Sequence, residues 1–292
     1  MDFYRRTSPG IFRNTALILA FAFVLAGCSS TKMAYRYADR GIVWWVEDYI
    51  SLTDGQKQQL NTDIRKLRQW HCSAELPRYR AWLDELESDL SEKQLDPATV
   101  AYHQQRLFGF FPDLLRQAIP VATNLLVSLS AEQVKELAEN MAESHREMTE
   151  EFLADTPEAT AEARAERTAE RVERWLGNLN QKQRLVIENW SADRGTQTQI
   201  WLQGRRNWQL ALLDLLERRS EPRFPAELEN LIVNSEEFRG KAYEAMMAES
   251  RAAMSSLMQD LIKAGDDSAL AHLQNRVADL RSDFGALACI PA

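Results

Sequence analysis

The chain has 292 residues, 45% of them hydrophobic, and a formal net charge of −8. This acidic balance argues against a protein that binds nucleic acid through its phosphates, and it gives the molecule as a whole no attraction to anionic headgroups. Eleven glycines and nine prolines are few for this length, and together with abundant Ala, Leu, Glu, Gln and Arg this scarcity favours helices.

The first residues have the features of a bacterial secretory signal. Arg5, Arg6 and Arg13 flank or precede the apolar run "TALILAFAFVL", which is too short to remain in a bilayer as a spanning helix. The sequence "LAGC" that ends at Cys28 is typical of the lipobox of bacterial lipoproteins, in which the cysteine is acylated and becomes the new N-terminus. The alternative is an ordinary signal peptide with a chance cysteine.

We therefore expect stable membrane attachment through several acyl chains on Cys28. Ser29 follows, and in Gram-negative bacteria a residue other than Asp there usually permits sorting to the outer membrane. The predicted organisation is a signal peptide over residues 1–27, a lipidated tether over 28–34 and a single helical domain over 35–292 that faces the periplasm. Signal removal takes away three positive charges and one negative charge, which changes the formal charge from −8 to −10.

Beyond the signal, apolar residues recur at intervals of three and four, and almost no stretch alternates with period two. The last predicted helix is the clearest case, with an apolar stripe made of Leu270, Leu273, Val277, Leu280, Phe284 and Leu287. Breaks are expected near Pro97, Pro112, Pro120, Pro157, Gly177, the segment 221–225 and Gly265. The sequence predicts an all-α bundle of about eight to ten helices without a sheet.

The first of these helices contains Trp44 and Trp45, and the sequence leaves two positions open for them. A stripe through Ile42, Trp45 and Tyr49 favours the core of the bundle. The short distance in sequence from Cys28 favours the membrane interface, where tryptophan is enriched.

One pattern occurs three times: "LTDGQKQQL" from Leu52, "LSAEQVKEL" from Leu129 and "LNQKQRLVI" from Leu179. In each, the second residue and the glutamine three later suit the N-cap and N3 positions of a capping box, which contributes about 1 kcal/mol. The predicted pairs are Thr53 with Gln56, Ser130 with Gln133, and Asn180 with Gln183. The leucine before each cap is expected to pack against the helix that follows.

Two other segments have more than one interpretation. The stretch "EATAEARAERTAERVER" from Glu158 to Arg174 is polar on all sides, which indicates either a thinly packed solvent-exposed helix or a surface for a partner helix. Met246, Met247, Met254 and Met258 form a methionine-rich face, which suits either an irregular core or a groove for varied partners.

Residues for catalysis or metal binding are sparse. His71, His103, His145 and His272 lie far apart, without a metal-ligand spacing, and no Cys-x-x-Cys, nucleophile elbow or glycine-rich phosphate loop occurs. We expect no enzyme, no metal, no cofactor, no small-molecule substrate and no nucleic-acid partner.

The cysteines that remain after lipidation of Cys28 are Cys72 and Cys289, an even pair in an oxidising compartment. Both are expected at the ends of helices, where two backbones can approach to about 5.5 Å. The sequence therefore predicts a disulfide that fixes the last helix beside the first ones, with free buried thiols as the alternative.

Two resemblances add to these patterns. The segment from Trp44 through Leu86 resembles a family of Gram-negative lipoproteins of unknown function. The residues that carry the likeness are Trp45, Asp48, Tyr49, Leu52, His71, Leu76, Pro77, Tyr79 and Leu83. This resemblance implies a lipidated helical protein and brings no activity with it.

The element Leu52, Thr53, Gln56 is also similar to the LTxxQ motif of the periplasmic Spy- and CpxP-like chaperones and stress sensors, which implies a cradle for unfolded clients. The other two copies depart from that motif at the second position. We expect an outer-membrane lipoprotein that acts through protein contacts as an envelope scaffold or assembly partner. The alternative is an LTxxQ-type chaperone for unfolded clients.

Overall fold

A computed structural model describes residues 28–93 and 95–289. Over these residues the fold is all-α, as expected, and contains somewhat more helices than the eight to ten predicted. In chain order they are α2 (Cys28–Arg36), α3 (Ala38–Glu47), α4 (Asp54–Trp70), the π-helical turn η2 (His71–Glu75), α5 (Leu76–Ser91), α6 (Pro97–Phe108), α7 (Phe111–Val127), α8 (Ala131–Phe152), α9 (Pro157–Leu176), α10 (Gln181–Ala192), α11 (Gln197–Glu217), α12 (Phe224–Val233), α13 (Ser235–Arg239), α14 (Lys241–Ala264) and α15 (Asp267–Leu287).

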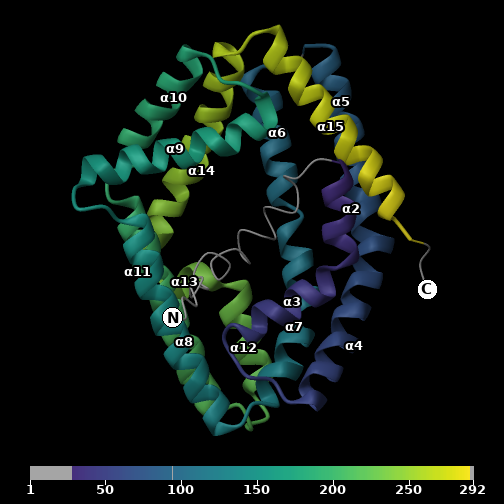
Figure 1. Cartoon of the computed structure of the whole chain (residues 1–292), viewed down its shortest axis with the longest axis vertical. Helices are drawn as coiled ribbons and strands as arrows, with labels where there is room; N and C mark the ends of the chain where they lie inside the picture. Colours follow the sequence, from purple (N-terminus) through teal and green to yellow (C-terminus); the bar gives the residue numbers. More distant parts are fainter. Residues whose placement is uncertain (1–27, 94, 290–292) are drawn as a thin grey trace, which may run out of the picture.

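The helices are arranged as a ring when viewed as in Figure 1. On one side α15 packs along α5, and α4 packs against α7; on the opposite side α8 packs against α11. The top of the view is formed by α9, α10 and α14, and the bottom by α7 and α12. The long helices thus connect an upper and a lower group of helices.

The apolar residues of this bundle gather in three clusters. The largest lies in the lower group and joins α3, α4, α7, α8, α11 and α12 around residues such as Leu60, Leu216 and Phe224. A second cluster joins α9, α10, α14 and α15, and a third joins α5 to α15. Trp175 and Leu273 border both upper clusters, so the upper group is continuous around them.

The segments α4, η2 and α5 follow one another without a loop, with a single π-helical turn in the middle. We expected Cys72 at the end of a helix; it lies instead inside this turn. Pro77 explains the widening, because a proline inside an α-helix lacks an N–H and collides with the carbonyl four residues earlier. In the π-turn the Leu76 N–H bonds to the His71 carbonyl five residues back, which provides room for Pro77 just after it.

The break predicted near Pro120 does not occur. α7 runs from Phe111 to Val127 with Pro120 inside it. One lost backbone hydrogen bond is tolerated here because α7 packs on both α4 and α12, and this tertiary contact outweighs the local preference.

The predicted signal peptide lies outside the described residues. The segment 28–34, expected as a tether, forms most of α2 and packs against α15. The Lys32 ammonium lies 3.0 Å from the buried Asp283 carboxylate of α15, which fixes α2 to the bundle. The first residues after position 27 are therefore part of the folded body.

The polar segment Glu158–Arg174 lies within α9 and packs thinly, through Thr160, Ala165 and partly buried Ala169. Two arginines of α9 turn inward: Arg164 Nη1 donates to the Ser191 carbonyl at 2.8 Å, and the Arg167 guanidinium lies 4.8 Å from the Phe152 ring centroid. The methionine face of α14 is partly buried and partly exposed: Met246 is buried and Met254 is exposed.

Within residues 28–93 and 95–289, no single helix combines the length and the apolar character needed to cross a membrane. The pair Pro97–Val127 and Ala131–Phe152, which bends by 119°, meets both criteria when it is taken together.

Candidate functional site

All three predicted capping boxes are present. The side chains of Thr53, Ser130 and Asn180 accept from the backbone N–H of the glutamine three residues later, and each glutamine side chain accepts from the cap N–H in return. The preceding residues Leu52, Leu129 and Leu179 are buried. The repeated pattern therefore begins α4, α8 and α10.

The first two boxes also bind each other. Gln56 Nε2 donates to Gln133 Oε1 at 3.0 Å, and Gln133 Nε2 donates to Gln56 Oε1 at 2.8 Å. Each amide also donates to a backbone carbonyl just before the other helix, Gln56 to Ser128 at 2.9 Å and Gln133 to Ser51 at 2.8 Å. We call this reciprocal arrangement the glutamine junction; it joins segments 77 residues apart.

A cavity of about 140 Å³ borders the glutamine junction and is lined by Gln56, Gln59, Asp63, Asn124 and neighbouring residues. Asp63 is buried and accepts from Gln59 at 3.0 Å and from Asn124 at 2.9 Å. Burial opposes its ionisation, but these hydrogen bonds and the Lys66 ammonium outweigh burial and hold the pKa of Asp63 below its ordinary value. Gln56 is bonded within the glutamine junction, and Gln59 and Asn124 are bonded to Asp63, so these polar groups of the cavity wall are engaged in structural hydrogen bonds.

The third capping box has a different partner. Gln183 Nε2 donates to the Leu261 carbonyl at 3.3 Å, and Asn180 Nδ2 donates to the Ala264 carbonyl at 2.9 Å. These carbonyls belong to the last turn of α14, which has no backbone donors left to satisfy them. A cavity of about 380 Å³ opens beside Gln183, and its lining combines leucines of α9, α14 and α15 with the charged residues Lys93, Asp266 and Asp267.

The glutamine junction is expected to couple the stabilities of α4 and α8. Gln56→Ala and Gln133→Ala should each lower the free energy of unfolding by about 1–2 kcal/mol, because each removes a cap partner and two donations. The double variant should cost less than the sum, by about 1 kcal/mol, because either single change already breaks the shared amide pair. Urea unfolding of the four proteins measures this coupling. The matched pair Gln56→Ala with Gln183→Ala should be additive, and coupling there as well would contradict the assignment.

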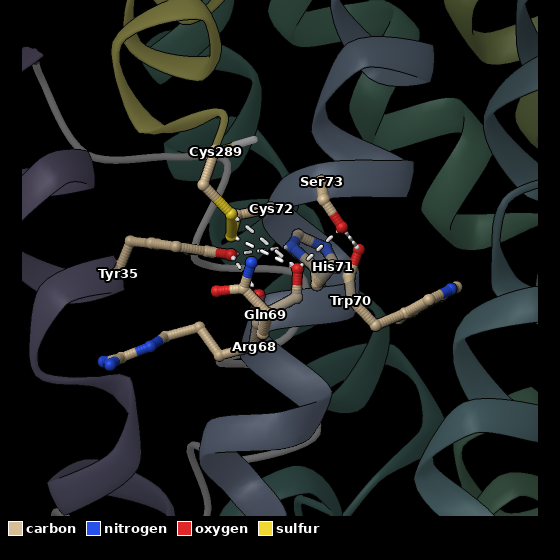
Figure 2. Close-up of a disulfide and its surroundings, with 8 residues drawn as sticks. All are labelled: Tyr35, Arg68, Gln69, Trp70, His71, Cys72, Ser73 and Cys289. Carbon is tan, nitrogen blue, oxygen red and sulfur yellow. Dashed lines mark hydrogen bonds between the residues drawn. A yellow bond between two sulfur atoms is a disulfide. The ribbon is translucent and has the colours of Figure 1, made fainter. Parts of the chain in front are cut away.

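A second group of polar side chains, besides the glutamine junction, surrounds η2 (Figure 2). Cys72 and Cys289 form the predicted disulfide, with Cα atoms 5.3 Å apart. The Cys289 N–H also donates to the Cys72 carbonyl at 3.1 Å, which extends the contact between α15 and η2 to the backbone. The last helix therefore lies beside α5 and α2, as predicted.

His71 stands next to the disulfide and faces two tyrosines. Its ring lies 5.6 Å from the Tyr35 ring and 5.5 Å from the Tyr79 ring, measured between centroids. Burial lowers the pKa of His71 to about 4, so the imidazole is neutral at pH 7. Burial also raises the pKa of Tyr35 to about 12. The Tyr35 hydroxyl and His71 Nδ1 share a hydrogen bond of 3.0 Å, and the same hydroxyl lies 3.5 Å from the Arg68 carbonyl (Figure 2).

Glu75, at the end of η2, was not singled out by the sequence. It is 2% exposed and pairs with Arg78 Nη1 at 2.6 Å, and the same nitrogen lies 2.8 Å from Asp113 Oδ2. Burial and the neighbouring Glu75 charge raise the pKa of Tyr79 above its ordinary value. The i, i+3 spacing of Glu75 and Arg78 is the one local signal of this pair.

The remaining histidines do not converge on His71. His103 Nε2 lies 2.8 Å from Asp89, and its Nδ1 accepts from Trp82 at 3.1 Å. Across the part of the chain that the structure describes, no group of three or more His, Cys, Asp or Glu side chains has the geometry to hold a metal ion. The glutamine junction and the group around η2 both connect helices through pairs of side chains.

The protein is an all-α protein in which the glutamines of the capping boxes and the residues around the disulfide bind other parts of the same chain. The chain belongs to the family described as "Family of unknown function (DUF6279)", whose model matches residues 48–244. This match covers both the glutamine junction and η2. No curated protein and no solved structure matches the chain.

Proposed function

We propose that the protein is a non-enzymatic lipoprotein of the outer membrane, anchored through Cys28 and facing the periplasm, that acts through protein–protein contacts as an envelope scaffold or assembly partner. The anchor is supported by the sequence "LAGC" and the basic and apolar stretches before it. The side chain of Cys28 lies outside what the structure describes.

The outer face of α9 carries the proposal of a protein partner. Glu158, Glu162, Glu166 and Glu170 are exposed and follow one another at intervals of four residues. Within the described chain none of these four carboxylates has an ion-pair partner within 4.0 Å. Like charges at this spacing destabilise a helix by about 0.2–0.5 kcal/mol per pair. A partner with basic side chains would relieve that repulsion.

Contacts on the inner side of α9 hold this helix, and with it the acidic outer face, in place. Arg164 binds the Ser191 carbonyl and Thr198 Oγ1, the latter at 3.0 Å from Nη2, and so fixes α9 to the end of α10 and the start of α11. Burial lowers the pKa of Arg164, but the group remains a cation at neutral pH. A partner would therefore meet a preformed surface and pay little ordering entropy on binding.

The proposal is tested by photocrosslinking in cells. A photoreactive residue at position 162 or 166 should give a light-dependent adduct of higher mass, and one at exposed Asp214 on α11 should not. Glu162→Lys with Glu166→Lys should reduce the adduct formed from position 170 several-fold without lowering the thermal midpoint, because the new lysines form opposite-charge pairs with Glu158 and Glu170. Equal yields from α9 and from position 214, or no adduct from α9, would count against the scaffold.

The chaperone alternative depended on the leucine–glutamine pattern and the methionine face. The three glutamines bind helix caps and other segments, and Met246 is buried in contact with the bundle. These glutamines and Met246 are therefore engaged within the bundle, whereas Met254 of the methionine face is exposed, and the chaperone function stays the second proposal with less support than the scaffold.

A further inference from the structure

An exposed stripe runs along the first two helices. It consists of Met33, Arg36, Tyr37, Arg40 and Trp44, and we call it the α2–α3 stripe. The exposed fractions of its three large apolar side chains are 60% for Met33, 54% for Tyr37 and 68% for Trp44. Met33 and Arg36 lie on α2, Arg40 and Trp44 lie on α3, and Tyr37 lies at the junction between the two helices; all five side chains are exposed. The stripe lies on helices seen at the front of Figure 1.

The opposite side of the same helices is fixed to the bundle. In α2, Thr31 is buried, Lys32 pairs with Asp283, and Tyr35 binds His71. In α3, Val43 and Val46 belong to the lower cluster. Trp45 also packs on that cluster, whereas the side chain of Trp44 is exposed. The two tryptophans, whose positions the sequence left open, therefore have different environments.

The stripe combines the residue types that bilayer interfaces favour. Tryptophan and tyrosine concentrate at the level of the headgroups, and arginine adds attraction to anionic lipids. The Arg40 guanidinium lies 5.5 Å from the Tyr37 ring centroid. Asp39, the nearest acidic residue, lies 3.8 Å from Arg68 Nη1. The stripe therefore presents two cations in a protein whose overall charge is negative.

We infer that the α2–α3 stripe lies on the phospholipid surface, with Tyr37 and Trp44 at headgroup depth. This inference rests on the proposed lipid anchor, because the stripe begins five residues after Cys28, and acyl chains there hold it within reach of the bilayer. Two consequences follow: α2 and α3 lie in the plane of the membrane, and the body of the ring takes one orientation towards it.

The test replaces the acyl chains with a second tether. The described residues contain all three apolar clusters, so a chain from residue 29 onward keeps the fold, which circular dichroism checks. A histidine tag before Ser29 holds this chain on vesicles of phosphatidylethanolamine, phosphatidylglycerol and a chelator lipid. Gly41→Cys supplies one free thiol for the fluorophore NBD, because Cys72 and Cys289 are joined. A side chain at Gly41 meets no atom within 4 Å, so the stripe stays intact.

Nitroxide-labelled headgroups should quench NBD at position 41 at least threefold more than NBD at the control Leu185→Cys, a residue 54% exposed on α10. Adding Tyr37→Ser and Trp44→Ser should abolish that difference, and adding the matched changes Leu210→Ser and Val233→Ser should leave it. Equal quenching at 41 and 185 overturns the inference, as does quenching that survives Tyr37→Ser with Trp44→Ser. Mass spectrometry of the N-terminal peptide from cells reports acylation of Cys28 separately, so failure of the anchor and failure of the stripe are distinguishable.

Discussion

Removal of the Cys72–Cys289 disulfide is expected to lower the free energy of unfolding by up to about 5 kcal/mol. The bond closes a loop with a sequence separation of 217, and cross-linking so long a loop removes much conformational entropy from the unfolded chain. The figure is an upper value, because residual structure in the unfolded chain reduces the entropy that the bond removes. Urea unfolding of Cys72→Ala with Cys289→Ala, compared with the parent protein, measures the loss.

The controls for this prediction separate the bond from the side chains. The parent protein in reductant should match the double variant to within about 1 kcal/mol. Hydrogen exchange should accelerate first at the C-terminal end of α15, since Val277 and Leu280 further up still pack on Leu83 and Leu90. A loss below 1 kcal/mol in both proteins would mean that the apolar contact alone fixes α15.

His71 is expected to make stability fall as the pH falls from about 6.5 to 4. Its folded pKa of about 4 lies below the ordinary value of 6.5. The unfolded chain therefore takes up the proton first, and protonation favours unfolding. The contribution is complete above pH 6.5 and is lost as the pH falls through the window to 4. The full difference corresponds to about 3 kcal/mol.

The measurement is a set of urea unfolding curves at pH 7.5, 6, 5 and 4. His71→Gln should reduce the slope between pH 6.5 and 4, while Tyr35→Phe should keep it, because burial and not the tyrosine hydroxyl is the cause of the shift. His145, whose pKa is also lowered by burial and by Arg205 and Arg206, should account for part of the slope that remains. Buried carboxylates such as Asp63 contribute a separate loss at lower pH, since the pKa of Asp63 is held below its ordinary value. A slope unchanged in His71→Gln would contradict the role of this imidazole.

The features that follow from neighbouring residues could be predicted from the sequence. Each capping box is set by residues three positions apart, and the apolar stripes of α4, α8 and α15 follow from periodicity alone. The disulfide was predictable for a different reason: two cysteines remain once Cys28 is assigned to lipid, and two cysteines permit one pairing.

The features that depend on distant residues could not be predicted. The sequence shows Gln56 and Gln133 as caps but holds no signal that the two caps meet across 77 residues. The π-turn forms because the helix continues through Pro77 and does not end before it. The packing of α5 on α15 favours this continuation, and the local sequence does not show that packing. In the sequence Arg164 is one more charge on a polar helix, and its inward position is visible only once the end of α10 and the start of α11 are placed.

The hydrogen bonds that the three glutamines make outside their own helices also explain why all three motifs carry an amide where helix starts usually accept a carboxylate. The N-terminus of a helix holds partial positive charge, so glutamate at N3 would be electrostatically favoured and would cap its own helix equally well. A carboxylate has no hydrogen to give, however. Gln56, Gln133 and Gln183 each donate to a group outside their own helix. The nitrogen of each amide thus makes the long-range hydrogen bond, and the pattern marks helix starts that bind a distant segment of the chain.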